Sequence, residues 1–157
     1  MPKFPVGTKA EARIEAFLEH ELDLIEPGLR LIRRQYPLNT LARHMVGKMD
    51  LYCQGEDGAD VCVELVSANL SSNDLGQMMA YFDILRGRVR GDKPQPRIYG
   101  IGPGMTPAFR HALNVLDGGR MINLTVLLFV PRAGVRLEDD LWAVDLYPPE
   151  TYLRISL

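Results

Sequence analysis

The chain has 157 residues, of which 46% are hydrophobic and 24% charged, the balance of a folded domain with its own core. Its net charge of −2 provides no overall basic field that would demand a nucleic-acid partner. The sequence shows no signal peptide and no transmembrane-length apolar run, and its two cysteines are too few for a disulfide scaffold or a zinc site. We expect one cytoplasmic domain over 1–157 without membrane association, with a loose lead-in at 1–8 and a C-terminal extension at 131–157.

The first predicted element is an amphipathic helix that begins at Thr8 and ends at Pro27-Gly28. Glu15 and Glu19 lie four residues apart beside its apolar stripe, and we interpret Glu19 as solvated helix surface. The stripe itself consists of residues at helical spacing: Ile14, Phe17, Leu18, Leu22 and Ile25. The following segment, Leu29 to Leu38, mixes apolar and basic residues and would form an edge strand or an irregular crossing.

Two strands are predicted next, Met45 to Gln54 and Asp60 to Val66, joined by a turn. A three-residue loop of Glu56, Asp57 and Gly58 would place glycine last, where hairpins favour a left-handed residue. Asp50 would then face Glu64 across the ladder, and Cys53 and Cys62 would lie on opposite faces. A two-residue turn would shift the register by one and separate the two acids. Facing carboxylates repel each other, and a divalent cation between them would reverse the sign of that interaction, so a metal site predicts the three-residue turn.

The remaining elements alternate between helices and strands. Ser71 and Asp74 are spaced as a capping box before a helix that carries Gln77 and Tyr81 on one face. A basic loop, a strand over Arg97 to Ile101, and a helix starting at Thr106-Pro107 follow. The most apolar strand, Met121 to Val130, is expected at the centre of the sheet, and Trp142 to Leu157 is expected to add an edge hairpin. This order predicts an α/β fold with a mixed sheet flanked by helices.

Basic residues gather in two parts of the chain, at 30–48 and 86–97. Each cluster alone is ordinarily solvated surface, although such clusters also contact phosphates. The candidates for nucleic-acid contact are Arg33, Arg34, Arg43, Lys48, Arg86, Arg88 and Arg90.

Three segments, at 17–29, 47–66 and 76–82, together resemble the PD-(D/E)XK, or restriction-endonuclease-like, superfamily. More narrowly they resemble the C-terminal nuclease domain of NucS-type (EndoMS) endonucleases. The family shows a helix leading into I-E-x-G, then G-x-x-D, V-V-x-E-x-K and Q-x-x-x-Y. The resemblance implies a restriction-endonuclease-like fold and metal-dependent phosphodiester hydrolysis on branched, mismatched or single-stranded DNA.

The resemblance also assigns roles to individual residues. Asp50 and Glu64 would hold Mg²⁺ or Mn²⁺, with the Leu65 carbonyl able to complete the ligand set. Glu15 matches the acidic residue on the first helix of the family. Gln77 and Tyr81 match the Q-x-x-x-Y pair, which lines the site and helps to position DNA or water.

Val66 departs from the family pattern, which has lysine at this position. Valine cannot orient water or stabilise developing charge, and Lys48, two residues before Asp50, is a weak replacement. Two functions therefore stay open: a metal-dependent nuclease, active or weakened, and a catalytically degenerate nuclease fold that binds nucleic acid or serves in assembly. Family members often form homodimers, and the apolar tail could supply an interface or complete the sheet: Leu141, Trp142, Val144 and Leu146.

Overall fold

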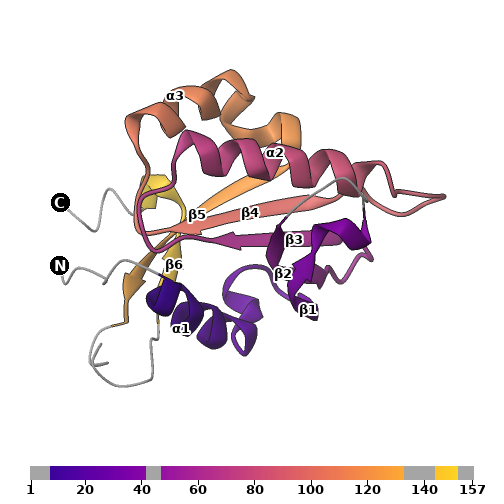
Figure 1. Cartoon of the computed structure of the whole chain (residues 1–157), viewed down its shortest axis with the longest axis horizontal. Coiled ribbons are helices and arrows are strands. Elements are labelled where there is room, and N and C mark those ends of the chain that lie inside the picture. The colour runs from indigo at the N-terminus through magenta and orange to yellow at the C-terminus, as the bar shows by residue number, and fades with distance from the viewer. Residues whose placement is uncertain (1–7, 42–46, 133–143, 152–157) are drawn as a thin grey trace.

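A computed structural model describes residues 8–41, 47–132 and 144–151 of the chain. The described residues form three layers, with a mixed sheet in the middle (Figure 1). Helices α2 (Ser72–Arg86) and α3 (Pro107–Val115) cover one face of the sheet, and α1 (Thr8–Glu19) covers the other. The predicted α/β class with helices on both sides of a mixed sheet is thus confirmed.

The six strands lie in the sheet in the same order as in the chain. Strands β1 (Arg30–Pro37), β2 (Lys48–Gln54) and β3 (Asp60–Leu65) are antiparallel neighbours. Strands β4 (Arg97–Gly102) and β5 (Leu124–Pro131) continue the sheet in parallel to β3, and β6 (Val144–Tyr147) closes it antiparallel to β5.

One expectation for the sheet needs correction. Strand β5 is not central, because it lies between β4 and the edge strand β6, and its apolar character reflects helices covering both faces. The tail contributes β6 to the sheet, whereas residues 142–143 and 152–157 of the expected edge hairpin lie outside the described residues, so the hairpin itself stays a prediction. Within β6, Val144 is buried and Leu146 packs on the core, so these residues complete the sheet; Leu141 and Trp142 lie outside the described residues.

The first helix is shorter than its apolar spacing predicted. Helix α1 ends at Glu19, and Leu22–Leu24 form a separate 3₁₀ turn, η1. Two further 3₁₀ segments, η2 (Leu38–Thr40) and η3 (Asp117–Ile122), follow β1 and α3. The helix starts agree with the predicted caps: Ser71 and Asp74 form the reciprocal capping box of α2, and the Thr106 hydroxyl accepts a hydrogen bond from Phe109 N–H at 3.1 Å.

Alternation along the strands divides the core between the two faces of the sheet. Side chains such as Leu51, Val63 and Ile101 pack beneath α1 with Ile14 and Leu18. Side chains such as Cys62 and Ile98 pack beneath α2 and α3. Cys53 and Cys62 belong to different faces and are both free and buried, as the hairpin register predicts.

The closed end of the β2–β3 hairpin is fastened by an arginine that no sequence pattern marked as structural. Arg97 of β4 donates to Glu26 from Nε and Nη2 at 2.7 and 2.8 Å. It also donates to Asp57, in the hairpin turn, from Nη1 and Nη2 at 2.7 and 3.0 Å. The Tyr99 hydroxyl adds a hydrogen bond to Glu26 at 2.8 Å. This junction ties the segment after α1, the turn and β4 together.

No helix among the described residues combines the length and the apolar character needed to cross a membrane.

Candidate active site

The β2–β3 hairpin brings Asp50 and Glu64 together at its open end. The ladder pairs Gln54 with Asp60, Tyr52 with Cys62 and Leu51 with Val63. Gly55 N–H donates to the Ala59 carbonyl at 2.9 Å, which leaves three residues in the loop. Gly58, the last of them, has φ +87°, the left-handed conformation that a three-residue hairpin favours. The same register continued by one pair sets Asp50 opposite Glu64, so the predicted three-residue turn is confirmed.

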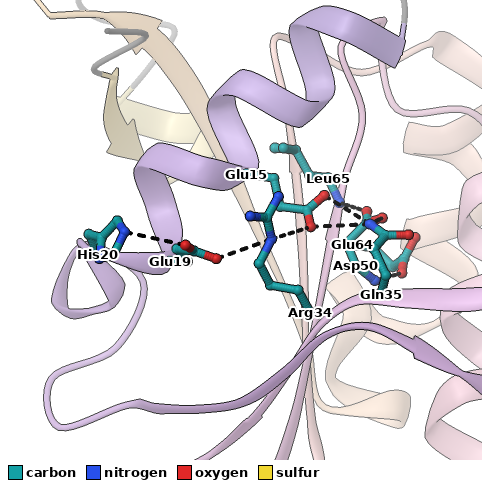
Figure 2. A network of polar contacts seen from close by, with 8 residues as sticks. All are labelled: Glu15, Glu19, His20, Arg34, Gln35, Asp50, Glu64 and Leu65. Atoms are coloured by element: carbon teal, nitrogen blue, oxygen red, sulfur yellow. Dashed lines mark hydrogen bonds and ion pairs between the residues drawn. The ribbon is translucent and has the colours of Figure 1, made fainter. Parts of the chain in front are cut away.

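At the two acids, side chains take over from the backbone ladder. Asp50 N–H donates to Glu64 Oε1 at 3.0 Å, and Leu65 N–H donates to Asp50 Oδ2 at 2.8 Å (Figure 2). Each carboxylate therefore accepts a hydrogen bond from the main chain of the opposite strand. This crossed pair of bonds fixes the orientation of both acids against the sheet.

The surroundings of the two acids oppose their ionisation. Burial, followed by the charge of Glu15, raises the pKa of Asp50 from 3.8 to about 6. Burial, followed by the charge of Asp50, raises the pKa of Glu64 well above its ordinary value. The influences that lower these pKa values are hydrogen bonds, from Leu65 N–H and Gln35 to Asp50 and from Asp50 N–H to Glu64. Binding a proton or an external cation would therefore stabilise the acid pair.

A third acid reaches this pair from α1. Glu15 is only 4% exposed and lies on the side of α1 that faces β1. Gln35 Nε2 donates to Glu15 Oε2 and Oε1 at 3.0 and 3.1 Å and to Asp50 Oδ1 at 3.2 Å. Figure 2 shows this amide between the two carboxylates. Glu15 thus approaches Asp50 through Gln35, a residue that the sequence analysis missed and that no motif pointed to.

Arg34 completes the network on the far side of Glu15. Its Nε lies 3.0 Å from Glu15 Oε1 and 3.1 Å from Glu19 Oε2. Glu19, expected on the solvated surface, is therefore an ion-pair partner whose side chain is 18% exposed. Arg34 was a candidate for phosphate contact; its Nε is held by two carboxylates while its side chain stays 38% exposed, and a contact with phosphate stays a prediction.

Helix α2 contributes Tyr81 to the site. The side chain is buried, and its hydroxyl donates to the Lys48 carbonyl at 3.4 Å. Burial, followed by the charge of Glu64, raises the pKa of Tyr81, and a hydrogen bond with Glu64 adds to this effect. Gln77, one turn earlier, is exposed and is not drawn into these contacts. The structure therefore brings one member of the Gln77–Tyr81 pair to the acids.

Val66 packs as an apolar residue at the end of β3. Its side chain is part-buried against the core beneath α2 and α3, and its N–H donates to the Ile101 carbonyl at 2.9 Å. A methyl group on Gly102 would lie 3.0 Å from Val66 Cγ2, so the valine lies directly against β4. Lys48, weighed as a substitute for the family lysine, has an exposed side chain.

The remaining basic candidates differ in whether another group of the chain already pairs with their side chains. Arg86 pairs with Asp83 at 2.9 Å, and Arg90 donates to the carbonyls of Gly87 and Val89. Arg33 is exposed beside the ring of Tyr36. Lys48 and Arg88 are exposed as well, whereas Arg43 lies outside the described residues.

The ligands that this site offers to a cation are oxygen atoms. Asp50, Glu64 and the Leu65 carbonyl belong to the class that Mg²⁺ and Mn²⁺ prefer. In the parts of the chain that the structure describes, no three or more His, Cys, Asp or Glu side chains are arranged to hold a metal ion. The side-chain ligands would then number two, in keeping with Mg²⁺ sites that rely on one or two carboxylates, water and substrate phosphate.

Comparisons with known proteins give the family and the fold of this chain. The family model described as the endonuclease NucS C-terminal domain matches residues 10–101. Endonuclease NucS of Frankia alni is 40% identical over 55 residues, which are 35% of this chain and 22% of that protein.

Solved structures with the same fold include EndoMS in complex with double-stranded DNA, with a TM-score of 0.62 and 22% identity. A repair endonuclease from Pyrococcus abyssi has a TM-score of 0.58 and 21% identity. These matches cover 82% and 80% of this chain but only 47% and 48% of the solved chains. The chain thus spans about half the length of these proteins. Because the family model matches more than half of the sequence, the chain belongs to the family of NucS endonuclease C-terminal domains.

Proposed function

We propose that this chain is a metal-dependent nuclease domain that acts on DNA, with Asp50 and Glu64 as the ligands of Mg²⁺ or Mn²⁺. The observation that carries this proposal is the pair of facing carboxylates, buried Glu64 and part-buried Asp50, whose pKa values are both raised. Facing carboxylates in a sheet are destabilising unless something else compensates their charge. A divalent cation bound between the two carboxylates would provide that compensation.

The chemistry would divide between the cation and the side chains around it. When bound, such a cation polarises a phosphate oxygen and makes water a better nucleophile. Glu15 and Tyr81 would act around the two ligands, since Glu15 connects to Asp50 through Gln35 and Tyr81 contacts Glu64. Gln77, exposed one turn from Tyr81, would face the DNA.

Val66 sets the expected rate. It stands where the family pattern has a lysine, and its apolar side chain packs against the core. A missing charge donor at such a position typically slows a reaction by roughly 100-fold or more. We therefore propose a slow nuclease in which the metal ligands are intact and the charge-stabilising amine is absent.

The exposed basic residues are the proposed contacts to DNA phosphates. Arg33, Lys48 and Arg88 carry exposed side chains, and Arg86 and Arg90 would join them after exchanging their present partners. The EndoMS neighbour is a complex with double-stranded DNA, which supports DNA as the partner. Branched, mismatched or single-stranded DNA, and a homodimer as the working form, are the finer parts of this proposal. The free, buried cysteines are compatible with a cytoplasmic location.

Cleavage assays with Mn²⁺ on branched, mismatched and single-stranded DNA test the proposal. We expect slow cutting by the wild type, none by Asp50→Ala, and roughly 100-fold faster cutting by Val66→Lys. Asp92→Ala, which changes an exposed acid, is the matched control and should leave the rate unchanged. Absence of cutting by both the wild type and Val66→Lys would rule out a nuclease.

The second candidate function is a degenerate nuclease fold that binds DNA without cutting it, and Val66 is the observation that favours it. Binding would then rest on phosphate contacts and weaken steeply with salt. Lys48→Ala should make the negative slope of log affinity against log salt less steep by about 1. Salt-independent binding would remove the electrostatic basis of this candidate.

A further inference from the structure

Gln35 occupies a backbone conformation that its residue type rarely adopts. It lies in strand β1 with φ +48°. The other non-glycine residues with positive φ in the described chain are Asp117 and Asn123, which belong to the types that tolerate this region. Strained backbone of this kind persists where surrounding contacts hold it, and it is concentrated at functional sites.

The strand pairing explains what this conformation achieves. Arg34 pairs with Leu51 and Tyr36 with Met49, so Gln35 lies opposite Asp50. A register shift between Leu31 and Arg33 precedes this position in the strand. Gln35 therefore lies beside Asp50, although its own strand, β1, is the edge strand of the sheet.

The Gln35 amide joins two carboxylates that repel each other. Its Nε2 is within 3.2 Å of three oxygen atoms, two on Glu15 and one on Asp50. The NH₂ group of an amide has two N–H donors, and these face the carboxylates. The opposite orientation would turn the amide oxygen toward the carboxylates and would be repulsive. Unlike a lysine or arginine, the neutral amide connects the acids without cancelling the negative charge that a cation needs.

The contact has a direct effect on Asp50. Gln35 holds Oδ1, and Leu65 N–H holds Oδ2 at 2.8 Å, so both oxygens of the carboxylate are oriented. Glu15 is itself held from behind by Arg34 at 3.0 Å (Figure 2). The chain of contacts from Arg34 through Glu15 and Gln35 therefore ends on a proposed metal ligand.

We propose that Gln35 is a positioning residue, which fixes the Asp50 carboxylate relative to Glu15 and so prepares it for a divalent cation. The metal part of this inference rests on the proposed function, whereas the orientation of Asp50 does not. Residues that orient metal ligands typically change metal affinity by roughly 10- to 100-fold when they are replaced.

Two substitutions separate this role from a role in folding. Gln35→Gly removes the amide and adopts positive φ without strain, so the fold should be retained. Gln35→Asn also tolerates the left-handed region, but its amide is one methylene too short to reach both carboxylates. The matched control is Gln54→Ala, which removes a glutamine from the same β1–β2 pair, where its side chain contacts Arg30 instead of the acids.

The first measurement is Mn²⁺ binding by titration calorimetry on the whole chain. We expect Gln35→Gly and Gln35→Asn to weaken binding by roughly 10-fold or more and Gln54→Ala to leave it unchanged. If the wild type binds Mn²⁺ and the three variants bind it with the same affinity, the inference is overturned.

The second measurement needs no metal. Leu65 N–H bonds to Asp50, so its hydrogen exchange, followed by NMR, reports whether that carboxylate is held. We expect faster exchange of Leu65 in both Gln35 variants and not in Gln54→Ala. Unchanged exchange would contradict the positioning role whatever the calorimetry shows. A wild type that binds no Mn²⁺ but shows the exchange effect would retain the positioning role and reject the proposed function.

Discussion

The two ends of the β2–β3 hairpin each gather carboxylates and treat their charges in opposite ways. At the closed end, Glu26 and Asp57 share the guanidinium of Arg97, and the hydrogen bond from Arg97 is the largest cause that lowers the pKa of Asp57 to about 2. At the open end, no cation of the described residues pairs with Asp50 or Glu64, and burial raises the pKa of Asp50 to about 6. Compensated charges stabilise the fold, whereas the uncompensated pair costs stability. This contrast is what the proposed metal site at the open end requires.

Removal of Arg97 should leave the carboxylates of the closed end without a cation, as at the open end. Of the substitutions considered, we expect it to lower the free energy of unfolding most. In Arg97→Ala, Glu26 and Asp57 would lose their shared cation, and Tyr99 would keep a hydrogen bond to an uncompensated carboxylate. We expect the free energy of unfolding to fall by about 3 kcal/mol, the lower end of the range for breaking a buried ion pair, because Asp57 is half exposed. Urea denaturation measures this change.

A suitable control is Arg120→Ala. The pair of Arg120 with Asp117 spans 3.9 Å between exposed side chains. Its loss should change the unfolding free energy by less than about 0.5 kcal/mol. Equal effects of the two substitutions would mean that the Arg97 junction is not structural.

The acid pair at the open end should make the stability of the fold depend on pH. The pKa of Asp50 is higher in the folded protein, about 6, than its ordinary 3.8, so protonated Asp50 stabilises the fold below pH 3.8. That contribution is lost as the pH rises through about 6. We expect the wild type to lose about 2 to 3 kcal/mol relative to Asp50→Asn between pH 3.8 and about 7.5 in the presence of EDTA.

Divalent metal sharpens this comparison. Mn²⁺ at a pH of about 7.5 should restore the stability of the wild type and leave Asp50→Asn unchanged, because a ligand stabilises only the state that binds it. A wild-type stability that is flat with pH and insensitive to Mn²⁺ would contradict an uncompensated acid pair.

The smallest expected effect concerns the turn that joins the two ends. Gly58 has φ +87° and open space where a methyl group would lie, with no atom within 4 Å, so Gly58→Ala introduces backbone strain without a clash. We expect a loss of about 1 kcal/mol. Gly76, in the interior of α2, is equally open, and Gly76→Ala should instead gain about 0.5 to 1 kcal/mol. Thermal denaturation of both variants tests this opposition of sign, and a stabilising Gly58→Ala would count against the turn as described.

Local signals were sufficient for some parts of the fold. Gly58 and the three-residue turn predicted the facing acids, and Ser71 and Thr106 predicted two helix starts, because caps and turns depend on neighbouring residues. The end of α1 was predicted wrongly for an equally physical reason. Leu22 and Ile25 repeat at a spacing that a 3₁₀ turn also satisfies, so the pattern does not separate the turn from a continuing helix.

By itself, the sequence determined the register of the hairpin and therefore the approach of Asp50 to Glu64, together with the apolar residue at position 66. The family resemblance named Glu15 and Tyr81 as further site residues, but only the tertiary structure decided how they and Gln35 meet this pair. Glu15 on α1 and Gln35 on β1 reach the acids because the helix and the edge strand pack on the same hairpin. Such contacts have no period in the sequence, since they depend on how separate elements pack and not on the spacing within any one of them.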